Sequence, residues 1–339
     1  MKNFHKGARR ASAVLIGAVF FIAGFFKLMD PVGSSLIMED YFKFLHLGFL
    51  TPISKPAALV FAFAEASCGI LLITGLWRRL TAMISGALLA FFTLLSIVLA
   101  IANPSMDCGC FGEAVHLTHV QTLIKNLVLD ALWCFAFLPF NNFESPRKVK
   151  YVCAAIAAVS TIIFTVHSVL GIPMMDFTTY NPGAEVQEED AQLPVCDFYG
   201  DYVNYGSFAG KVMVVSEYDP SRLSPKAAER TERLLRDAQE AGYRPVRLLS
   251  ISPDQLQDNI SFAADRRTLM TLNRSNGGAV YIADQQVIRK WSVNNLPDSE
   301  LLQELYDKNP TEEMLRRTVT DRMRIQGFLL YVFAVLLLL

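Results

Sequence analysis

Two cysteines separated by a single glycine are the residues of this 339-residue sequence with the clearest capacity for chemistry. Cys108-Gly109-Cys110 stands in a short segment between two long apolar stretches. A disulfide between these cysteines closes a very small ring, and Gly109 relaxes the backbone enough to permit it. Because a strained disulfide is easily reduced, the motif favours thiol–disulfide exchange over bracing of the loop.

Metal binding and a chemically inert loop are the alternatives for this segment. His116 and His119 follow the two cysteines, and two cysteines with two histidines would suit zinc by number. Their spacing matches no standard zinc pattern, so we predict no metal site. Asp107 and His119 are instead expected to support the cysteine pair.

The other four cysteines divide into two groups. Cys68, Cys134 and Cys153 fall within long apolar stretches, where a free thiol usually packs as a small hydrophobic side chain. Cys196 lies in the charged part of the chain and is a candidate for transient pairing with the motif. The alternative is that Cys196 is a solitary packed thiol.

The apolar stretches that surround the motif are long enough to cross a membrane. Mean hydropathy is +0.31 and 19% of residues are charged, and a helix needs ~20 mostly apolar residues to span a bilayer. Five stretches qualify, at residues 11–28, 56–77, 80–106, 117–140 and 151–175. We therefore expect a lipid bilayer as partner. A signal peptide is the alternative for the first stretch, but no small-x-small cleavage site follows it.

Lysine and arginine residues orient these spans, because they concentrate in cytoplasmic loops. They gather at the N-terminus and in the second and fourth connections: Lys2, Lys6, Arg9, Arg10, Arg78, Arg79, Arg147, Lys148 and Lys150. This pattern predicts a membrane protein with a cytoplasmic N-terminus and with the cysteine motif on the outer side of the membrane. A net charge of −1 and the lack of a basic stripe interleaved with aromatic residues exclude a nucleic-acid partner.

Charged residues inside the spans are costly unless they are paired or solvated. Glu65, Lys125 and Asp130 are such residues. We expect Glu65 and Lys125 to pair between neighbouring helices. Such a pair could bind a quinone head group or relay protons, or it could only hold the helices together, and the sequence favours neither.

Two thirds of the charged side chains lie in residues 172–326. Within this segment, residues 176–326 predict an extracytoplasmic α/β domain. Strands are expected at 211–218, 245–252, 279–284 and 286–293. Helices are expected after Ser224, after the capping box that starts at Ser252, and at 298–308. The chain then ends on thirteen uncharged residues, 327–339, which we interpret as a sixth span that is short for a bilayer or as a terminal anchor dipping into the membrane.

The order β-α-β-α-β-β-α resembles the thioredoxin fold. Thioredoxins carry C-x-x-C after the first of these strands, whereas residues 218–224 contain no cysteine here. Asn276-Gly277-Gly278 also stands where that family has a cis-proline. The resemblance therefore implies a thioredoxin-like domain that binds a partner without redox chemistry of its own.

Residues 10–140 resemble the MauE branch of the DoxX-like membrane proteins. The segment 106–126, MDCGCFGEAVHLTHVQTLIKN, contains the CGCFG motif typical of that branch, and 20–31 and 61–79 resemble its first two helices. The resemblance implies a four-helix membrane bundle and a part in periplasmic disulfide formation, and DoxX relatives are linked to quinone-dependent oxidation. The whole layout resembles DoxX-family membrane proteins of Bacteroidota, which implies a bacterial inner-membrane protein with its outer side in the periplasm.

Together these features predict a bundle at 1–140, a fifth transmembrane helix at 141–175, a periplasmic thioredoxin-like domain at 176–326 and an apolar end at 327–339. Two functions follow. In the first, Cys108 and Cys110 cycle between dithiol and disulfide and pass electrons between a periplasmic thiol protein and a quinone or other carrier. In the second, the protein is a non-catalytic membrane scaffold or assembly factor whose outer domain binds a client protein.

Overall fold

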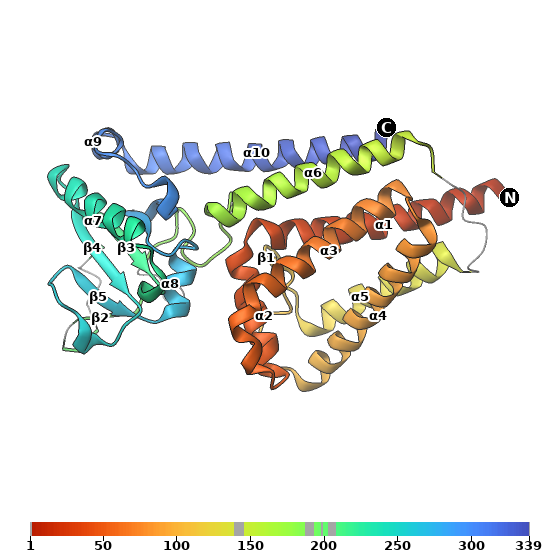
Figure 1. Ribbon diagram of the computed structural model, residues 1–339, viewed down its shortest axis with the longest axis horizontal. Helices are drawn as coiled ribbons and strands as arrows, with labels where there is room; N and C mark the ends of the chain where they lie inside the picture. Colours follow the sequence, from red (N-terminus) through yellow and green to blue (C-terminus); the bar gives the residue numbers. More distant parts are fainter. Residues whose placement is uncertain (1, 139–145, 187–192, 198, 203–207, 339) are drawn as a thin grey trace. The chain divides into compact units, whose positions relative to one another are not determined.

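The computed structural model describes residues 2–138, 146–186, 193–197, 199–202 and 208–338. The chain divides into two compact units, which we describe separately (Figure 1). Unit 1 comprises Met1–Val166 and Gln326–Leu339, and unit 2 comprises His167–Ile325.

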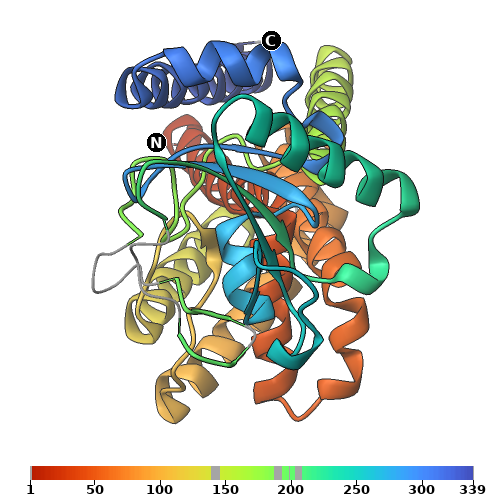
Figure 2. The same cartoon turned by 90° about the vertical axis from the view of Figure 1, so that its left-hand side faces the viewer.

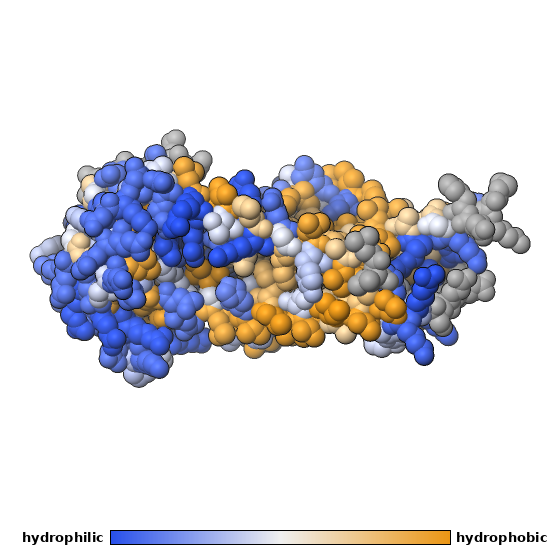
Figure 3. Space-filling view, turned by 90° about the horizontal axis from the view of Figure 1, so that it is seen from above, coloured by the Kyte–Doolittle hydropathy of each residue, from blue (hydrophilic) through white to orange (hydrophobic). Residues whose placement is uncertain are grey.

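Five helices within the described residues are long and apolar enough to cross a membrane, as the sequence predicts. They are α1 (Lys2–Met29), α3 (Ser54–Thr74), α4 (Arg78–Ala102), α5 (His119–Phe137) and α6 (Val149–Leu170). Apolar side chains cover much of the surface over these helices, whereas polar side chains cover unit 2 (Figure 3). The last two residues of the predicted span 117–140 lie outside the described residues.

Helix α2 (Pro31–Phe44) and the 3-10 helix η1 (Gly48–Ile53) fill the connection between α1 and α3, where no helix is predicted. Asp30 ends α1 and caps α2, because its side chain accepts a hydrogen bond from the Gly33 N–H at 2.9 Å. Pro31 occupies the first helical position, where its fixed φ is favourable. The first connection is therefore ordered, and it covers one end of the bundle (Figure 1).

Helices α1 and α3 approach each other to backbone contact. A Cβ added at Gly24 would lie 2.5 Å from the Ala66 nitrogen, and one at Gly69 would lie 2.5 Å from the Phe21 nitrogen. Small residues at such positions let two membrane helices gain dispersion contacts along their whole length. This pair forms the axis on which the other helices of unit 1 pack.

The apolar end of the chain belongs to one long helix, α10 (Pro310–Leu338), and does not begin a separate element at residue 327. No glycine or proline breaks it before Gly327, and α10 is not among the five candidate spans because its first half is highly charged. Val332 and Leu336 pack with Phe21 and Leu28 of α1. The predicted sixth span is thus corrected to the last part of a helix that starts seventeen residues earlier.

Unit 2 contains a six-stranded mixed sheet in the order β2-β5-β4-β3-β6-β7. The strands are β2 (Val195–Cys196), β3 (Lys211–Glu217), β4 (Arg244–Leu249), β5 (Ser261–Ala264), β6 (Gly278–Ala283) and β7 (Gln286–Trp291). Strands β3, β4 and β5 are parallel, whereas β6 and β7 form an antiparallel hairpin beside β3. The predicted strands at 211–218, 245–252, 279–284 and 286–293 are all present.

Helices cover both faces of this sheet (Figure 2). Alternate residues of β3 point to opposite faces, so Met213 packs with α7 (Pro225–Glu240) and α9 (Ser299–Asp307), whereas Val214 packs with α8 (Arg266–Leu272). Ser224 caps α7, as the sequence predicts, and Asp298 caps α9.

The helix predicted to start at the Ser252 capping box is wrong. The segment forms only a single 3-10 turn, η4 (Pro253–Gln255), and the Ser252 side chain makes no capping hydrogen bond. The chain then extends as β5, because Ser261 to Ala263 pair with Arg247 to Leu249 of β4. Helix α8 begins later, at the Asp265 cap, so tertiary strand pairing overrides the local helix signal.

Candidate functional site

The two motif cysteines lie side by side where a short loop enters β1 (Cys110–Glu113). Their Sγ atoms are 3.0 Å apart, both thiols are free, and Cys108 is buried. Gly109 between them has φ +62°, which places it in the left-handed region that favours glycine. A Cβ there would lie 2.4 Å from Cγ2 of Ile37, so both backbone and space require glycine.

Helix α2 holds this loop in place. The Tyr41 hydroxyl donates a hydrogen bond of 2.6 Å to the carbonyl oxygen of Cys108. Burial, reinforced by the nearby cysteines, raises the pKa of Tyr41, so its hydroxyl stays a donor at neutral pH. Helix α2, for which the sequence gives no prediction, thereby fixes the position of the cysteine pair.

The two thiols are electrostatically different. The hydrogen bond from Cys108 lowers the pKa of Cys110 to about 5 against the opposing effect of burial, and the positive charges of Lys125 and Lys27 lower it further. The same hydrogen bond, together with burial, raises the pKa of Cys108. At neutral pH the arrangement therefore favours a Cys110 thiolate that accepts a hydrogen bond from the Cys108 thiol.

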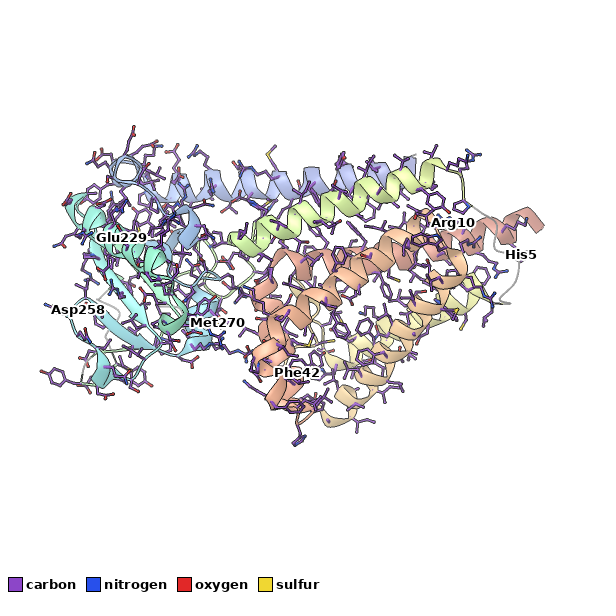
Figure 4. The ribbon with its side chains drawn as sticks, in the orientation of Figure 1. His5, Arg10, Phe42, Glu229, Asp258 and Met270 are labelled. Carbon is purple, nitrogen blue, oxygen red and sulfur yellow. The ribbon has the colours of Figure 1, made fainter. Side chains whose placement is uncertain are left out.

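A cavity of about 220 Å³ lies beside the cysteine pair. Most of its lining is apolar and comes from α1 to α5. Phe42 of α2 is part of this lining, and Figure 4 shows it at the end of the bundle away from Arg10 of α1. Both cysteines contribute to its wall. A few polar side chains also line it, namely Lys27, Ser34, Tyr41, Glu65, Ser96, Thr122, Lys125 and Asn126.

The predicted Glu65–Lys125 pair is wrong, because Glu65 pairs with Lys27. Lys27 of α1 lies 2.6 Å from Glu65 of α3, and both side chains are mostly buried. The close α1–α3 packing brings these two residues together at one level of the bundle. The Lys125 ammonium lies 5.3 Å from the ring centre of Phe111, and no carboxylate pairs with it among the described residues.

The remaining polar residues of the spans connect α4 to α5. Thr93 donates a hydrogen bond of 2.8 Å to Asp130, and the Asn126 amide donates one of 3.0 Å to Ser96. These contacts leave Asp130 outside the cavity lining. Asp130 and Asn126, two polar residues of α5, the least apolar of the five spans, therefore both have partners on α4.

The side chains expected to support the motif lie farther along the loop and do not join the cysteines. Asp107 Oδ2 lies 3.1 Å from His116 Nδ1 on an exposed part of the loop. His119 is buried, and its Nε2 lies 3.0 Å from the Pro104 carbonyl oxygen. Within the described part of the chain no three His, Cys, Asp or Glu residues gather as metal ligands would.

In unit 2, Cys196 is half-buried on the edge strand β2, where it pairs with Ala263 of β5. The turn after β3 has no thiol, and its backbone is bound internally. The Asn276 amide donates to the Asp219 carbonyl at 2.7 Å and accepts from the Asp219 N–H at 3.0 Å. The Asn276 side chain thus occupies both backbone hydrogen-bonding groups of Asp219 in this turn.

Three site residues were not singled out as such from the sequence. Lys27 lies in the last turn of α1, where a lysine can face an acid on a neighbouring helix. Tyr41 and Thr122 carried no local signal. Thr122 lies near the start of α5, which begins at a capping box formed by Thr118 and Gln121, and its Oγ1 lies 4.0 Å from the Cys110 sulfur.

Comparison with known proteins identifies the first part of the chain. Residues 7–139 match the family model described as methylamine utilisation protein MauE. A curated relative, Protein TlpB of Flavobacterium psychrophilum, is 26% identical over 153 residues, which cover 44% of this chain and 41% of that protein. The match thus spans less than half of that relative, and no solved structure matches the chain. Residues 7–139, which include the bundle α1–α5 and its cysteine loop, therefore form a MauE family domain.

Proposed function

We propose that this membrane protein takes part in thiol–disulfide exchange, with Cys108 and Cys110 cycling between dithiol and disulfide. The observation that carries the proposal is the free pair of thiols 3.0 Å apart, one of them with a pKa of about 5. Two sulfurs this close form a disulfide with a small movement. A thiol ionised at neutral pH is also the state that reacts in exchange.

The difference between the thiols assigns them different roles. When the pair is oxidised, an incoming client thiolate attacks the sulfur whose partner leaves more easily. Cys110 has the lower pKa and is the better leaving group, so the client attacks Cys108 and forms a mixed disulfide with it. A second client thiolate then attacks that bond. The client leaves as a disulfide, and Cys108 and Cys110 remain as two thiols.

The orientation expected from the loop charges places the pair on the periplasmic side of the inner membrane, on the same side as unit 2. We propose that unit 2 is a thioredoxin-like domain that binds a partner protein without redox chemistry. Its β3-α7-β4 unit followed by α8, a hairpin and α9 supports this assignment. The turn at Asp219, occupied by Asn276, offers no nucleophile. Cys196 is the one thiol of unit 2 that could meet the pair.

Thiol trapping in intact cells tests the redox role. Cells are quenched in acid, and free thiols are tagged with a heavy maleimide that resolves oxidised from reduced protein on a gel. We expect the Cys108–Cys110 pair to be mostly oxidised during respiration and to become reduced when respiration is blocked. If the redox state of the pair is the same under both conditions, the redox role is wrong and the non-catalytic scaffold function is favoured.

A trapping variant tests the assignment of roles. In Cys110→Ser a mixed disulfide at Cys108 cannot be resolved, so a client, or Cys196, should remain attached and be identified by mass spectrometry of non-reduced peptides. Cys108→Ser is the matched control and should trap less, because it lacks the sulfur to which the client is proposed to bond. Equal trapping by both variants would contradict the proposed roles.

A further inference from the structure

The cavity beside the cysteine pair reaches the lipid-facing surface of the bundle. Phe61 of α3 and Phe91 of α4 line it and are still 40% and 48% exposed. Their rings stack against each other with centres 6.4 Å apart, and both helices are candidate membrane spans. A molecule dissolved in the bilayer can therefore enter between α3 and α4 by displacing these rings.

Next to the cysteines, the cavity brings together a nucleophile, a hydroxyl and a cation. The Cys110 sulfur lines the wall, and its pKa of about 5 makes it a thiolate at neutral pH. Thr122 Oγ1 lies 4.0 Å from this sulfur. Lys125 follows Thr122 by three positions on α5, so the two side chains share one face of the helix, and both line the cavity.

This set of groups suits the reduction of an O–O bond. When a thiolate displaces one oxygen of a peroxide, negative charge develops on the other, and a hydroxyl and an ammonium beside it stabilise that charge. The sulfenic acid that forms must then meet a thiol before it is oxidised further. Cys108 meets this need, because its sulfur is 3.0 Å from that of Cys110.

The wall of the cavity determines which peroxide fits. An apolar cavity of ~150 Å³ accommodates benzene, so 220 Å³ accommodates a hydroperoxyl group with a few carbons of an acyl chain. The rest of such a chain remains between α3 and α4. A hydroperoxyl group in hydrocarbon lacks hydrogen-bond partners, which costs free energy, and it gains them from Thr122 and Lys125 on entering.

We propose that this cavity takes lipid hydroperoxides from the bilayer and that Cys110 reduces them to the alcohol. The inference rests on the redox function proposed above, because it uses the same pair and leaves it as the disulfide that client thiols reduce. It adds a substrate class that the client reaction does not involve.

The reaction balances in two steps. The Cys110 thiolate attacks the terminal oxygen of ROOH; the S–O bond forms, the O–O bond breaks, and its electron pair leaves on RO⁻. This alkoxide takes up the proton that Cys110 released on ionising and departs as ROH. The Cys108 sulfur then attacks the sulfenic sulfur, the S–S bond forms and water leaves. Two thiols and one hydroperoxide thus give one disulfide, one alcohol and one water.

The test uses the reduced full-length chain in nanodiscs of saturated lipid without oxygen, with linoleic acid hydroperoxide as the probe. Disulfide formation at Cys108–Cys110 is followed by maleimide tagging, and the hydroxy acid by chromatography. We expect one hydroxy acid per disulfide, and a faster reaction than with hydrogen peroxide at the same concentration. A faster reaction with hydrogen peroxide would overturn the lipid substrate.

Two tryptophan variants test the cavity. Leu95→Trp fills the cavity that Leu95 lines, whereas Leu94→Trp adds the same side chain at a 65% exposed neighbour outside the lining. We expect Leu95→Trp to slow the reaction with lipid hydroperoxide about tenfold or more, and Leu94→Trp to leave it unchanged. Equal rates in the two variants would overturn the site.

Thr122 gives a second test, which also covers the case in which Leu95→Trp fails to fold. Thr122→Val removes the hydroxyl and keeps the shape, and we expect the reaction with lipid hydroperoxide to slow about tenfold or more. Thr122→Ser keeps the hydroxyl and should restore most of the rate. If valine and serine give the same rate, the hydroxyl does not act on the peroxide and the site is wrong.

A water-soluble aromatic disulfide separates this inference from the function on which it rests. It should oxidise the pair in the native chain and in the four variants alike. If it does so but lipid hydroperoxide does not, the hydroperoxide site is wrong and the redox pair stands. If neither oxidant closes the disulfide, the redox function itself is wrong.

Discussion

The surroundings of Cys110 favour its thiolate, whereas those of Cys108 favour the neutral thiol. Cys110 has a pKa of about 5, set first by the hydrogen bond from Cys108 and then by Lys125 and Lys27. The buried cysteine Cys68 of the bundle lacks such neighbours and packs as an apolar side chain. Reactivity therefore follows from what surrounds a cysteine, and not from its presence in a short motif alone.

Alkylation of Cys110 should depend little on pH. An ordinary cysteine has a pKa of ~8.5, so its reaction with iodoacetamide quickens about tenfold per pH unit below that value. Because the pKa of Cys110 is lowered to about 5, its thiolate is already formed. We expect a nearly constant rate between about pH 6 and about pH 9, measured by peptide mass spectrometry. A tenfold rise per unit in that window would contradict the assignment.

Replacing Lys125 by methionine should raise the pKa of Cys110, because it removes a positive charge close to the thiolate. The alkylation profile should then rise through the neutral range. Lys125→Arg keeps the charge and should restore most of the native profile. Lys43→Met is the control, since Lys43 is exposed on α2 and its charge is not among those acting on Cys110.

At the scale of elements, the site depends on how closely α1 and α3 pack. Gly24 and Gly69 allow the backbones to touch, and that approach sets the level at which Lys27 meets Glu65. Helix α2 then covers the end of the bundle and holds the cysteine loop through Tyr41. These three helices and the cysteine loop therefore set the level of the site, to which α5 adds Lys125.

Gly69→Ala should destabilise the bundle, because the new Cβ would lie 2.5 Å from a backbone nitrogen that cannot move aside. Overpacking of this kind costs about 1–3 kcal/mol. We expect a lower midpoint for thermal aggregation of the full chain in detergent. Gly48→Ala is the control, because nothing lies within 4 Å of a Cβ at that position. Equal midpoints for the two variants would argue against backbone contact.

In unit 2, Asp176 joins the start of the unit to β7 through Lys290, with Oδ2 and Nζ 2.5 Å apart. Burial would raise the pKa of Asp176, but the Lys290 charge and hydrogen bonds from Lys290 and Thr178 lower it below its usual value. Its ionised form therefore stabilises the fold above the unfolded pKa of ~3.9. That stability is lost as the pH falls through the folded pKa.

Lys290→Met should leave a buried carboxylate without its partner and cost about 3–5 kcal/mol at neutral pH. We expect faster hydrogen exchange in peptides of β7, measured by mass spectrometry of the full chain. Asp176→Asn should lose less, and the protection of its β7 amides, corrected for the intrinsic pH dependence of amide exchange, should not change further on acidification. Native exchange rates in Lys290→Met would show that the pair contributes nothing.

At the scale of the whole molecule, the charge pattern of the loops makes one prediction about sidedness. In a chain without its native cysteines, a cysteine restored at 108 or 196 should react with an impermeant maleimide added to cells with a permeable outer membrane. A cysteine at Arg147, in the connection before α6, should react only after lysis. Labelling at 147 before lysis would reverse the orientation.

Sequence alone determined the long spans and all but one of the larger strands of unit 2. These features depend on local composition and periodicity, which neighbouring residues fix among themselves. The sequence also singled out the cysteine motif as the candidate reactive site, because Gly109 and the two cysteines are adjacent in the chain.

Only the tertiary structure decided the partners. Glu65 binds Lys27 because α1 and α3 touch along their glycines, a contact between residues 38 positions apart. Residues 261–264 extend as a strand because β4 offers them an edge, although a helix signal precedes them. Tyr41 holds Cys108 across 67 positions. Pairing energies depend on distances across the fold, and a local pattern of residue types does not contain them.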